Sequence, residues 1–398
     1  MIKPDIQKPR LAILTSRFPY PLEKGDKLRL YYQICHLNTF FEIDLFVIGD
    51  GDTKKEDIQQ ILPYVKQVFY YRMDFFSRII QMFTGFWRGL PFQVSYFYEP
   101  KIHQLILNEF KNNPPDHIYC QLARMAKYAE NTDIPKTLDY MDAFGIGMYR
   151  RASVAGFWAK WIYLKEADLM KKYEKKLLSA FDFFTIISEQ DKKYILEDSA
   201  KNNKEIEVLP NGIDDSFFQK PGVNICYDLV FVGNMGYLPN IEAAEFLVKQ
   251  ILPLLPKTIK VLIAGARPHK RVTTLQSDNV HVSGWFDDIR EAYASARIFV
   301  APIWSGTGQQ NKILEAMALG LPCVTTPPVN NAILGQDGVN ILLASDVCTF
   351  VDKINFLLSD DSAIYNIGQQ AKIFVKQNFS WKQSVLTLVN IILSTIKK

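Results

Sequence analysis

The stretch between residues 297 and 324 constrains the fold more than any other part of the sequence. It contains an apolar strand pattern over 297–301, a glycine-rich turn over 305–308 and a helical pattern over 310–319. A glycine at position 320 then separates this helix from a second apolar strand pattern. The order strand, turn, helix, strand predicts a parallel sheet covered by helices.

The same stretch predicts an anion site. A glycine-rich turn exposes backbone amides, and the positive end of the helix dipole points at the same place. Lys312 and Glu315 are three residues apart and therefore lie on one side of the helix. We expect Lys312 to stabilise the charge of a leaving diphosphate without a metal ion, and Glu315 to accept hydrogen bonds from ribose hydroxyls.

Strand and helix patterns alternate along the whole chain, and its 398 residues are enough for two domains. The fold class we expect is α/β, with two Rossmann-like, doubly wound parallel-sheet domains. The polar, lysine-rich stretch 198–205 is the best linker candidate. We therefore place the domains at 1–203 and 204–379, with an apolar helix over 380–398 that closes the second domain or packs back on the first.

Three loops of the second half follow strand patterns and contain glycines: 233–236, 265–268 and 305–308. Because the carboxyl ends of parallel strands share one edge of the sheet, we expect these loops to converge there. The first two loops contain Asn234 and Arg267. In the first half, Gly25 lies in a loop that follows a strand pattern, beside lysines. We favour the interpretation that this loop faces the ligand over the interpretation that Gly25 only shapes a turn.

Asp139 and Asp142 follow the fourth strand pattern of the first half, and two carboxylates there suit a hydroxylated acceptor. Asp142 has a second interpretation, as the cap of the next helix. The acidic pair at positions 50 and 52 lies in a polar turn, so a solvated turn is favoured over a metal–diphosphate site. The five cysteines form no CxxC pair, and no metal site is expected.

The net charge of +4 comes from 46 basic and 42 acidic residues that are interspersed, which argues against a nucleic-acid partner. Neither a signal peptide nor a membrane-spanning run is recognisable, so a cytoplasmic protein is expected. Residues 68–98 are rich in aromatic side chains and contain Arg72, Arg78 and Arg88. Two interpretations stay open for this segment: peripheral contact with the inner face of the cell membrane, or a helical hairpin packed on the domain core.

The chain resembles the bacterial retaining glycosyltransferases of family 4, and in particular the sugar transferases of exopolysaccharide and surface-glycan gene sets. The resemblance runs nearly end to end, and its most specific part is the helix after the glycine turn. The matching motifs are Phe18–Pro21 with Lys24–Asp26, Ile187–Glu189, Leu209–Asp214, Phe231–Gly233, Ile263–Gly265, Gly306–Gly308, Asn311–Ala318 and Gly320–Val324.

The resemblance implies a GT-B fold, in which two Rossmann-like domains face a cleft, and a last helix that returns to the first domain. It implies transfer of a hexose-type sugar, with retention, from a nucleotide-diphosphate sugar to a glycan or lipid-linked glycan. The donor would be a substrate, and no cofactor is implied. By position, the resemblance implies that Glu315 binds the ribose, that the amides of 306–308 hold the sugar and diphosphate, and that Gly25 lets the first loop approach the phosphates. Together with the residues argued from the sequence, the candidate catalytic residues are Lys312, Glu315, Asp139 and Asp142, and the candidate donor-binding residues are Gly25, Gly233, Asn234, Arg267, Gly306, Thr307, Gly308, Gln309, Asn311, Lys312 and Glu315.

The sequence departs from the family pattern at three places. Thr307 stands where a sugar-reading glutamate is usual, and Asn234 and Asn240 lie near the positions of the usual arginine and lysine. The region of Asp139 and Asp142 replaces the usual histidine after the fourth strand of the first domain. Lys312 and Arg267 are therefore our candidates for neutralising the diphosphate. Two other functions stay open, a GT-B-type nucleotide-sugar 2-epimerase and a non-catalytic nucleotide-sugar-binding partner of a glycan assembly complex.

Overall fold

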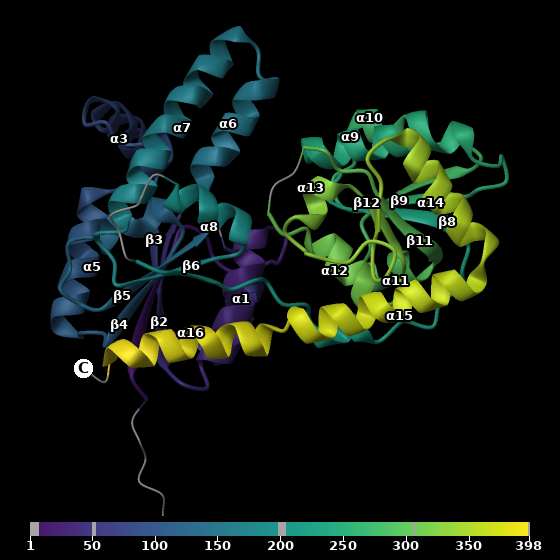
Figure 1. The fold of residues 1–398 in the computed structure, drawn as a ribbon. Helices are drawn as coiled ribbons and strands as arrows, with labels where there is room; N and C mark the ends of the chain where they lie inside the picture. Colours follow the sequence, from purple (N-terminus) through teal and green to yellow (C-terminus); the bar gives the residue numbers. More distant parts are fainter. Residues whose placement is uncertain (1–7, 50–52, 198–203, 306–307, 397–398) are drawn as a thin grey trace, which may run out of the picture. The chain divides into compact units, whose positions relative to one another are not determined.

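The computed structural model describes residues 8–49, 53–197, 204–305 and 308–396. The chain divides into two compact units, Met1–Pro210 with Trp381–Lys398 and Asn211–Ser380 (Figure 1). The division therefore follows residue 210, whereas the linker was expected at 198–205, of which 198–203 lie outside the described residues. Each unit contains one parallel sheet, as expected for Rossmann-like domains.

The first unit is built on a seven-stranded sheet in the order β3-β2-β1-β4-β5-β6-β7, in which all neighbouring strands are parallel. The inner strands β4 and β5 are buried along their whole length and β1 is buried after its first residue, as expected for strands covered on both faces. The strands are β1 (Arg10–Thr15), β2 (Glu42–Gly49), β3 (Gln67–Arg72), β4 (His117–Gln121), β5 (Lys136–Met141), β6 (Phe183–Ile186) and β7 (Ile206–Val208).

Helix α16 completes the first unit although it is the last helix of the described chain. The Trp381 ring stacks on Tyr32 of α1 with centroids 5.1 Å apart, and Leu388 and Ile392 join the core cluster that contains Leu30. The helices of this unit are α1 (Gly25–Leu37), α2 (Lys55–Gln59), α3 (Phe75–Trp87), α4 (Phe92–Tyr96), α5 (Pro100–Asn112), α6 (Phe144–Val154), α7 (Phe157–Leu177), α8 (Glu189–Leu196) and α16 (Trp381–Ile396).

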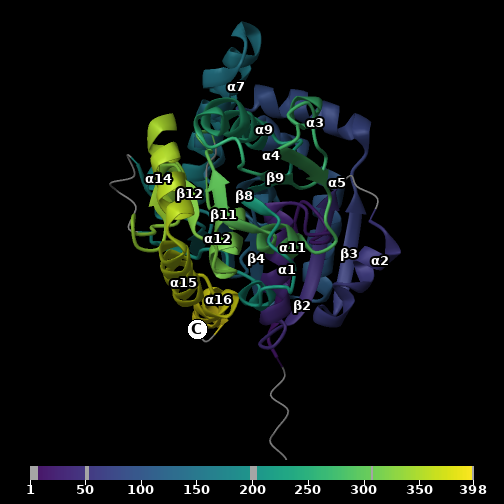
Figure 2. The same cartoon turned by 90° about the vertical axis from the view of Figure 1, so that its right-hand side faces the viewer.

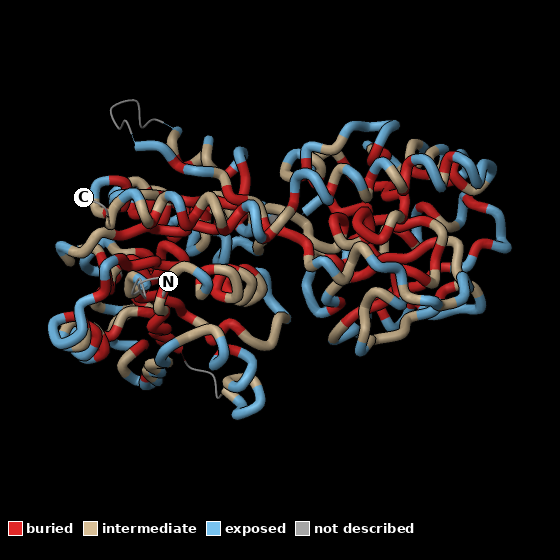
Figure 3. Tube along the Cα trace, turned by 90° about the horizontal axis from the view of Figure 1, so that it is seen from below, coloured by how far each residue is buried: buried red, intermediate tan, exposed pale blue. Residues whose placement is uncertain are grey.

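The second unit is built on a six-stranded parallel sheet in the order β10-β9-β8-β11-β12-β13. As in the first unit, the buried residues gather along the sheet (Figure 3). The strands are β8 (Tyr227–Val232), β9 (Val261–Ala264), β10 (Val280–Gly284), β11 (Ala296–Ala301), β12 (Cys323–Thr325) and β13 (Leu342–Leu343).

Two helices of the second unit approach each other through glycines. Helices α12 and α15 lie side by side (Figure 1, Figure 2). Gly320, with φ of +79°, ends α12, and a Cβ on Gly368 of α15 would lie 2.1 Å from the Gly320 carbonyl oxygen. The helices are α9 (Leu238–Phe246), α10 (Lys270–Thr273), α11 (Ile289–Ala294), α12 (Asn311–Ala318), α13 (Pro327–Asn330), α14 (Val347–Ser359) and α15 (Asp361–Asn378).

Across the described ranges, none of the helices combines the length and the apolar character needed to cross a membrane.

Candidate functional site

Each sheet reverses its strand order at one point, between β1 and β4 in the first unit and between β8 and β11 in the second. Ligands of open parallel sheets bind at the carboxyl edge beside such a point. In the second unit, the loops after β8 and β11 are the two glycine-rich loops over 233–236 and 305–308. The topology therefore places the predicted donor loops at the position where this fold binds ligands.

The loops after β8 and β9 are in direct backbone contact. The Met235 amide donates to the Ala266 carbonyl at 2.8 Å. Gly265 has φ of +138°, and a Cβ there would lie 1.8 Å from the Gly233 carbonyl oxygen, so only glycine allows this approach. The expected convergence of these two loops is thus present in the structure.

Lys312 lies in the first turn of α12, and its side chain reaches the loop after β8. Its ammonium donates to Oδ1 of Asn240 at 2.5 Å, and Nδ2 of Asn240 donates to the Asn234 carbonyl at 2.9 Å. This pair of bonds fixes the orientation of the Asn240 amide. Burial lowers the pKa of Lys312 to about 8, against the effect of the nearby Glu315 charge.

Glu315 lies one turn further along α12 and is half-buried. Its Oε2 accepts a hydrogen bond from the hydroxyl of the buried Tyr293 at 2.8 Å. Burial raises the pKa of Glu315, while the bond from Tyr293 and the charge of Lys312 oppose this rise. Tyr293 uses one carboxylate oxygen, and Oε1 has no hydrogen-bond partner among the described residues, so it remains available to a hydroxyl ligand.

The other predicted residues of α12 and its preceding loop differ in their surroundings. Gln309 is held by the chain itself, because its side-chain amide accepts from the Asn211 amide at 2.9 Å and donates to the Asn211 carbonyl at 2.8 Å. Asn311 Oδ1 is buried without a hydrogen-bond partner in the described chain. Gly308 has φ of +77°, whereas Gly306 and Thr307 lie outside the described residues.

Arg267 follows β9 and is exposed, with φ of +54°. It shares the loop that contacts Met235, so it lies close to the loop that contains Gly233 and Asn234. Three partners in this region, Asn211, Asn240 and Tyr293, were not predicted as site residues. Only the folded chain brings them to α12, since Lys312 and Asn240 are separated by 72 positions in the sequence.

Asp139 is not accessible to a hydroxylated acceptor in this structure. It lies inside β5 with no exposed surface, because the strand continues to Met141. Its two oxygens accept hydrogen bonds from Arg29 Nε at 2.7 Å, Tyr119 at 3.0 Å and Thr185 at 2.9 Å. All of these partners are internal, so Asp139 belongs to a buried ion pair that joins α1 to the sheet.

Asp142 follows β5 and is half-buried. It does not cap α6, whose first amide, of Phe144, donates instead to Glu174 Oε1 at 2.7 Å. Burial raises the pKa of Asp142 to about 7, and the charge of Asp191 adds to this rise. A Cβ on the exposed Gly25 would lie 3.2 Å from Met141 Cε, so Gly25 and Asp142 lie at the same edge of the sheet.

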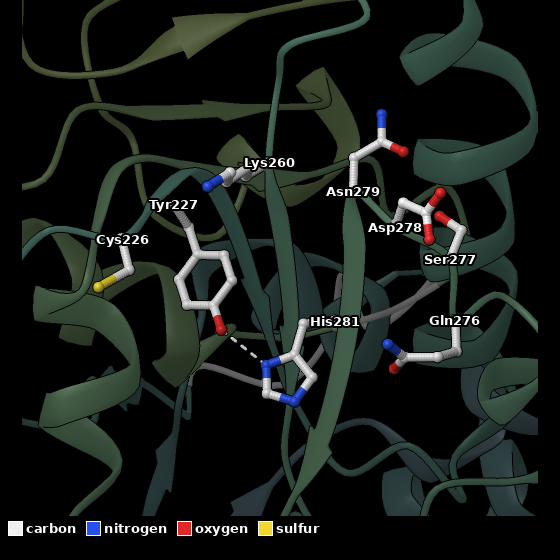
Figure 4. Close-up of a pocket in the computed structure, with 8 residues that line it drawn as sticks. All are labelled: Cys226, Tyr227, Lys260, Gln276, Ser277, Asp278, Asn279 and His281. Atoms are coloured by element: carbon white, nitrogen blue, oxygen red, sulfur yellow. Dashed lines mark hydrogen bonds between the residues drawn. The ribbon is translucent and has the colours of Figure 1, made fainter.

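Two further features of the described chain lie outside this site. No three His, Cys, Asp or Glu side chains are grouped to hold a metal ion there, and residues 50–52 are outside the described ranges. A shallow polar pocket is lined by Tyr227, Lys260 and His281 (Figure 4). It lies at the amino ends of β8, β9 and β10, the edge opposite to the glycine-rich loops.

Comparisons with known proteins show what the chain is similar to. Residues 226–360 match the family model described as "Glycosyl transferases group 1". A Klebsiella pneumoniae protein described as an uncharacterized 44.6 kDa protein in the cps region is 21% identical over 394 residues, which cover 94% of this chain and 97% of that protein. An uncharacterized glycosyltransferase of Methanocaldococcus jannaschii is 24% identical over 240 residues, 54% of this chain and 59% of that protein.

Solved structures agree on the fold. Sucrose-phosphate synthase of Thermosynechococcus elongatus superposes with a TM-score of 0.71 at 14% identity, over 97% of this chain and 98% of that one. HepE of Anabaena, solved in complex with UDP and glucose, superposes with a TM-score of 0.68 at 14% identity. The match covers 97% of this chain and 100% of that one. The chain therefore has the GT-B fold. The match to the group 1 family model lies within its second unit.

Proposed function

We propose that the chain moves a hexose-type sugar from a nucleotide-diphosphate sugar onto a glycan or lipid-linked glycan, without a metal ion and with retention of the anomeric configuration. The observation that carries this proposal is the pair on α12, Lys312 and Glu315, which partners from separate elements hold inside the group 1 domain. The relative from a cps region supports a role in bacterial surface polysaccharide or exopolysaccharide synthesis.

The chemistry required of the donor site is stabilisation of a leaving group. When the bond between the anomeric carbon and the phosphate oxygen breaks, its electron pair stays on the diphosphate. Lys312 and the amides at the amino end of α12 stabilise that charge. With a pKa of about 8, Lys312 is largely charged at neutral pH. The second oxygen of Glu315 accepts a hydrogen bond from a ribose hydroxyl, which positions the nucleotide.

Retention follows from attack on the same face that the diphosphate leaves. The acceptor hydroxyl bonds to the anomeric carbon, and its proton passes to the departing phosphate oxygen. In the first unit, Asp142 binds a hydroxyl of the acceptor, and Gly25 lies at the same edge of the sheet. Asp139 contributes indirectly, because its ion pair with Arg29 holds β5 against α1.

The positions of the histidines do not favour the 2-epimerase alternative, which needs acid–base groups at the carboxyl edge. His117 is buried between Thr137 and Thr395, and His281 lies in the pocket at the opposite edge of the second sheet. His269 caps α10 with its ring, accepting from the Arg271 amide at 3.2 Å. The transferase proposal therefore stands ahead of the epimerase.

The test is nucleoside diphosphate release from a panel of nucleotide-sugars, with and without glycan acceptors. We expect Glu315→Ala to lower kcat/KM about 10- to 100-fold, because one charge-assisted hydrogen bond is lost. Glu291→Ala, at an exposed position on α11, is the matched control and should keep wild-type release. Wild-type release by the Glu315 variant would refute the site, and tight donor binding without release from any donor would indicate the non-catalytic alternative.

A further inference from the structure

Helix α3 presents its apolar face to solvent. Its large side chains at six positions are exposed, from 37% for Ile79 to 85% for Trp87. At 100° per residue these positions fall within an arc of about 140°, so they form one continuous face. The six residues are Phe75, Phe76, Ile79, Ile80, Phe83 and Trp87.

The opposite face of α3 is polar or small, and it is the face that packs on the unit. Arg78 is only 4% exposed, its guanidinium lies 4.9 Å from the Tyr96 ring centroid, and Nη1 donates to the Tyr96 hydroxyl at 2.8 Å. A Cβ on Gly85 would lie 1.9 Å from Ser95 Oγ, so α3 and α4 are in close contact. An amphipathic helix of a globular protein normally turns its apolar face toward the core. An exposed apolar face of this size is typical of a surface that binds another molecule or a membrane.

A second exposed apolar group lies at the start of α7, at the tip of the α6–α7 hairpin that projects from the first unit (Figure 1). Phe157, Trp158 and Trp161 are 82%, 83% and 66% exposed. No residue of α7 is buried before Glu166. The Glu166 carboxylate accepts from the Phe92 and Gln93 amides at 2.7 and 3.0 Å, so α7 is bonded to α4, the helix that supports α3.

Within the two segments that carry these groups, every charged side chain is basic. Segments 75–98 and 143–165 contain no aspartate or glutamate. A two-fold contact with a second copy of the chain would bring like charges together, which disfavours self-association. An anionic lipid surface attracts these cations and takes up aromatic side chains at its interface. The cations of these segments that are not buried are Arg88, Arg150, Arg151, Lys160 and Lys165.

We propose that α3 and the α6–α7 tip together form a docking surface for an anionic lipid bilayer. Helix α3 lies in the interface with its exposed face toward the acyl chains, and the aromatic tip inserts beside it. This inference does not rest on the transfer reaction. It also has a bearing on the acceptor, because α6 begins two residues after Asp142, so a lipid-linked acceptor would reach that carboxylate from the same membrane.

The test is co-sedimentation of the full chain with vesicles of phosphatidylcholine alone or mixed with phosphatidylglycerol. We expect binding to the mixed vesicles that weakens with salt. Trp158→Ser with Trp161→Ser, and separately Phe76→Ser with Phe83→Ser, should each lower the partition coefficient about tenfold or more. Phe356→Ser with Tyr365→Ser is the matched control, since these exposed aromatic residues lie on α14 and α15. The control should bind as the wild type does.

Circular dichroism of each variant checks that it folds, and exposed positions should tolerate these changes. Absence of binding to the mixed vesicles would overturn the proposal, as would equal binding by the tip, α3 and control variants. Light scattering measures whether the protein is a monomer or a dimer in solution. A dimer that the tip or α3 variants dissociate would mean that this surface joins two copies of the chain instead.

Discussion

At the scale of single residues, the spacing of Lys312 and Glu315 was readable from the sequence, but their environment was not. A helical period predicts that the two side chains share one side of α12. Their partners, Asn240 and Tyr293, come from α9 and α11, and only the fold brings them together. The lowered pKa of Lys312 comes from burial, which no sequence pattern reports.

This pKa leads to a testable pH dependence. Lys312 carries its charge below a pKa of about 8 and loses it as the pH rises through that value. The dissociation constant of a nucleoside diphosphate should therefore rise about tenfold between pH 7 and pH 9. Isothermal titration calorimetry measures it, with Lys312→Arg as the control because arginine stays charged throughout this range. The same rise in both proteins would show that another group is responsible.

The two aspartates after the fourth strand pattern show why carboxylates are hard to assign from sequence. Both were predicted at a strand end, but β5 runs two residues further than Asp139. That difference puts Asp139 into the core with Arg29 and leaves Asp142 at the edge. The cap expected from Asp142 is supplied by Glu174 of α7, more than thirty positions later in the sequence than Asp142.

At the scale of elements, the apolar strands and the glycine turn predicted the two parallel sheets correctly, because strands buried on both faces leave a clear apolar run. Residues 68–98 were harder to interpret. Their first part forms the edge strand β3, whose residues are all half-buried or exposed, and α3 follows it. Periodicity identifies an amphipathic helix but not the direction that its apolar face takes, so the orientation of α3 required the structure.

Two helical glycines predict opposite effects of the same substitution. A Cβ on Gly368 would lie 2.1 Å from a backbone oxygen, so Gly368→Ala should destabilise the second unit by roughly 1–3 kcal/mol. A Cβ on Gly147 of α6 would meet nothing within 4 Å, so Gly147→Ala should stabilise the first unit by about 0.5–1 kcal/mol. Urea unfolding measures both free energies. Changes of the same sign would contradict the packing of α12 against α15.

At the scale of the whole molecule, the second unit is one continuous segment, residues 211–380, whereas the first is made from both ends of the chain. The second unit also has its own core cluster. We therefore expect residues 211–380 to fold when expressed alone, with a cooperative thermal transition that circular dichroism can follow.

The first unit should behave differently when its last segment is missing. Residues 1–210 alone would leave Tyr32 and the core around Leu30 without their cover from α16. We expect this fragment to aggregate, and light scattering reports the outcome. A soluble, cooperatively folding 1–210 fragment would show that α16 is dispensable for this core.

The position of α16 also sets an order of events during translation. Ribosomes add roughly 5–20 residues per second, so residues 211–380 take about ten to thirty seconds to make. Throughout that interval, the nascent first unit has its sheet but lacks the helix that covers Tyr32 and Leu30. We therefore expect the second unit to have its whole segment synthesised before the first unit, whose core stays without its cover until α16 is made.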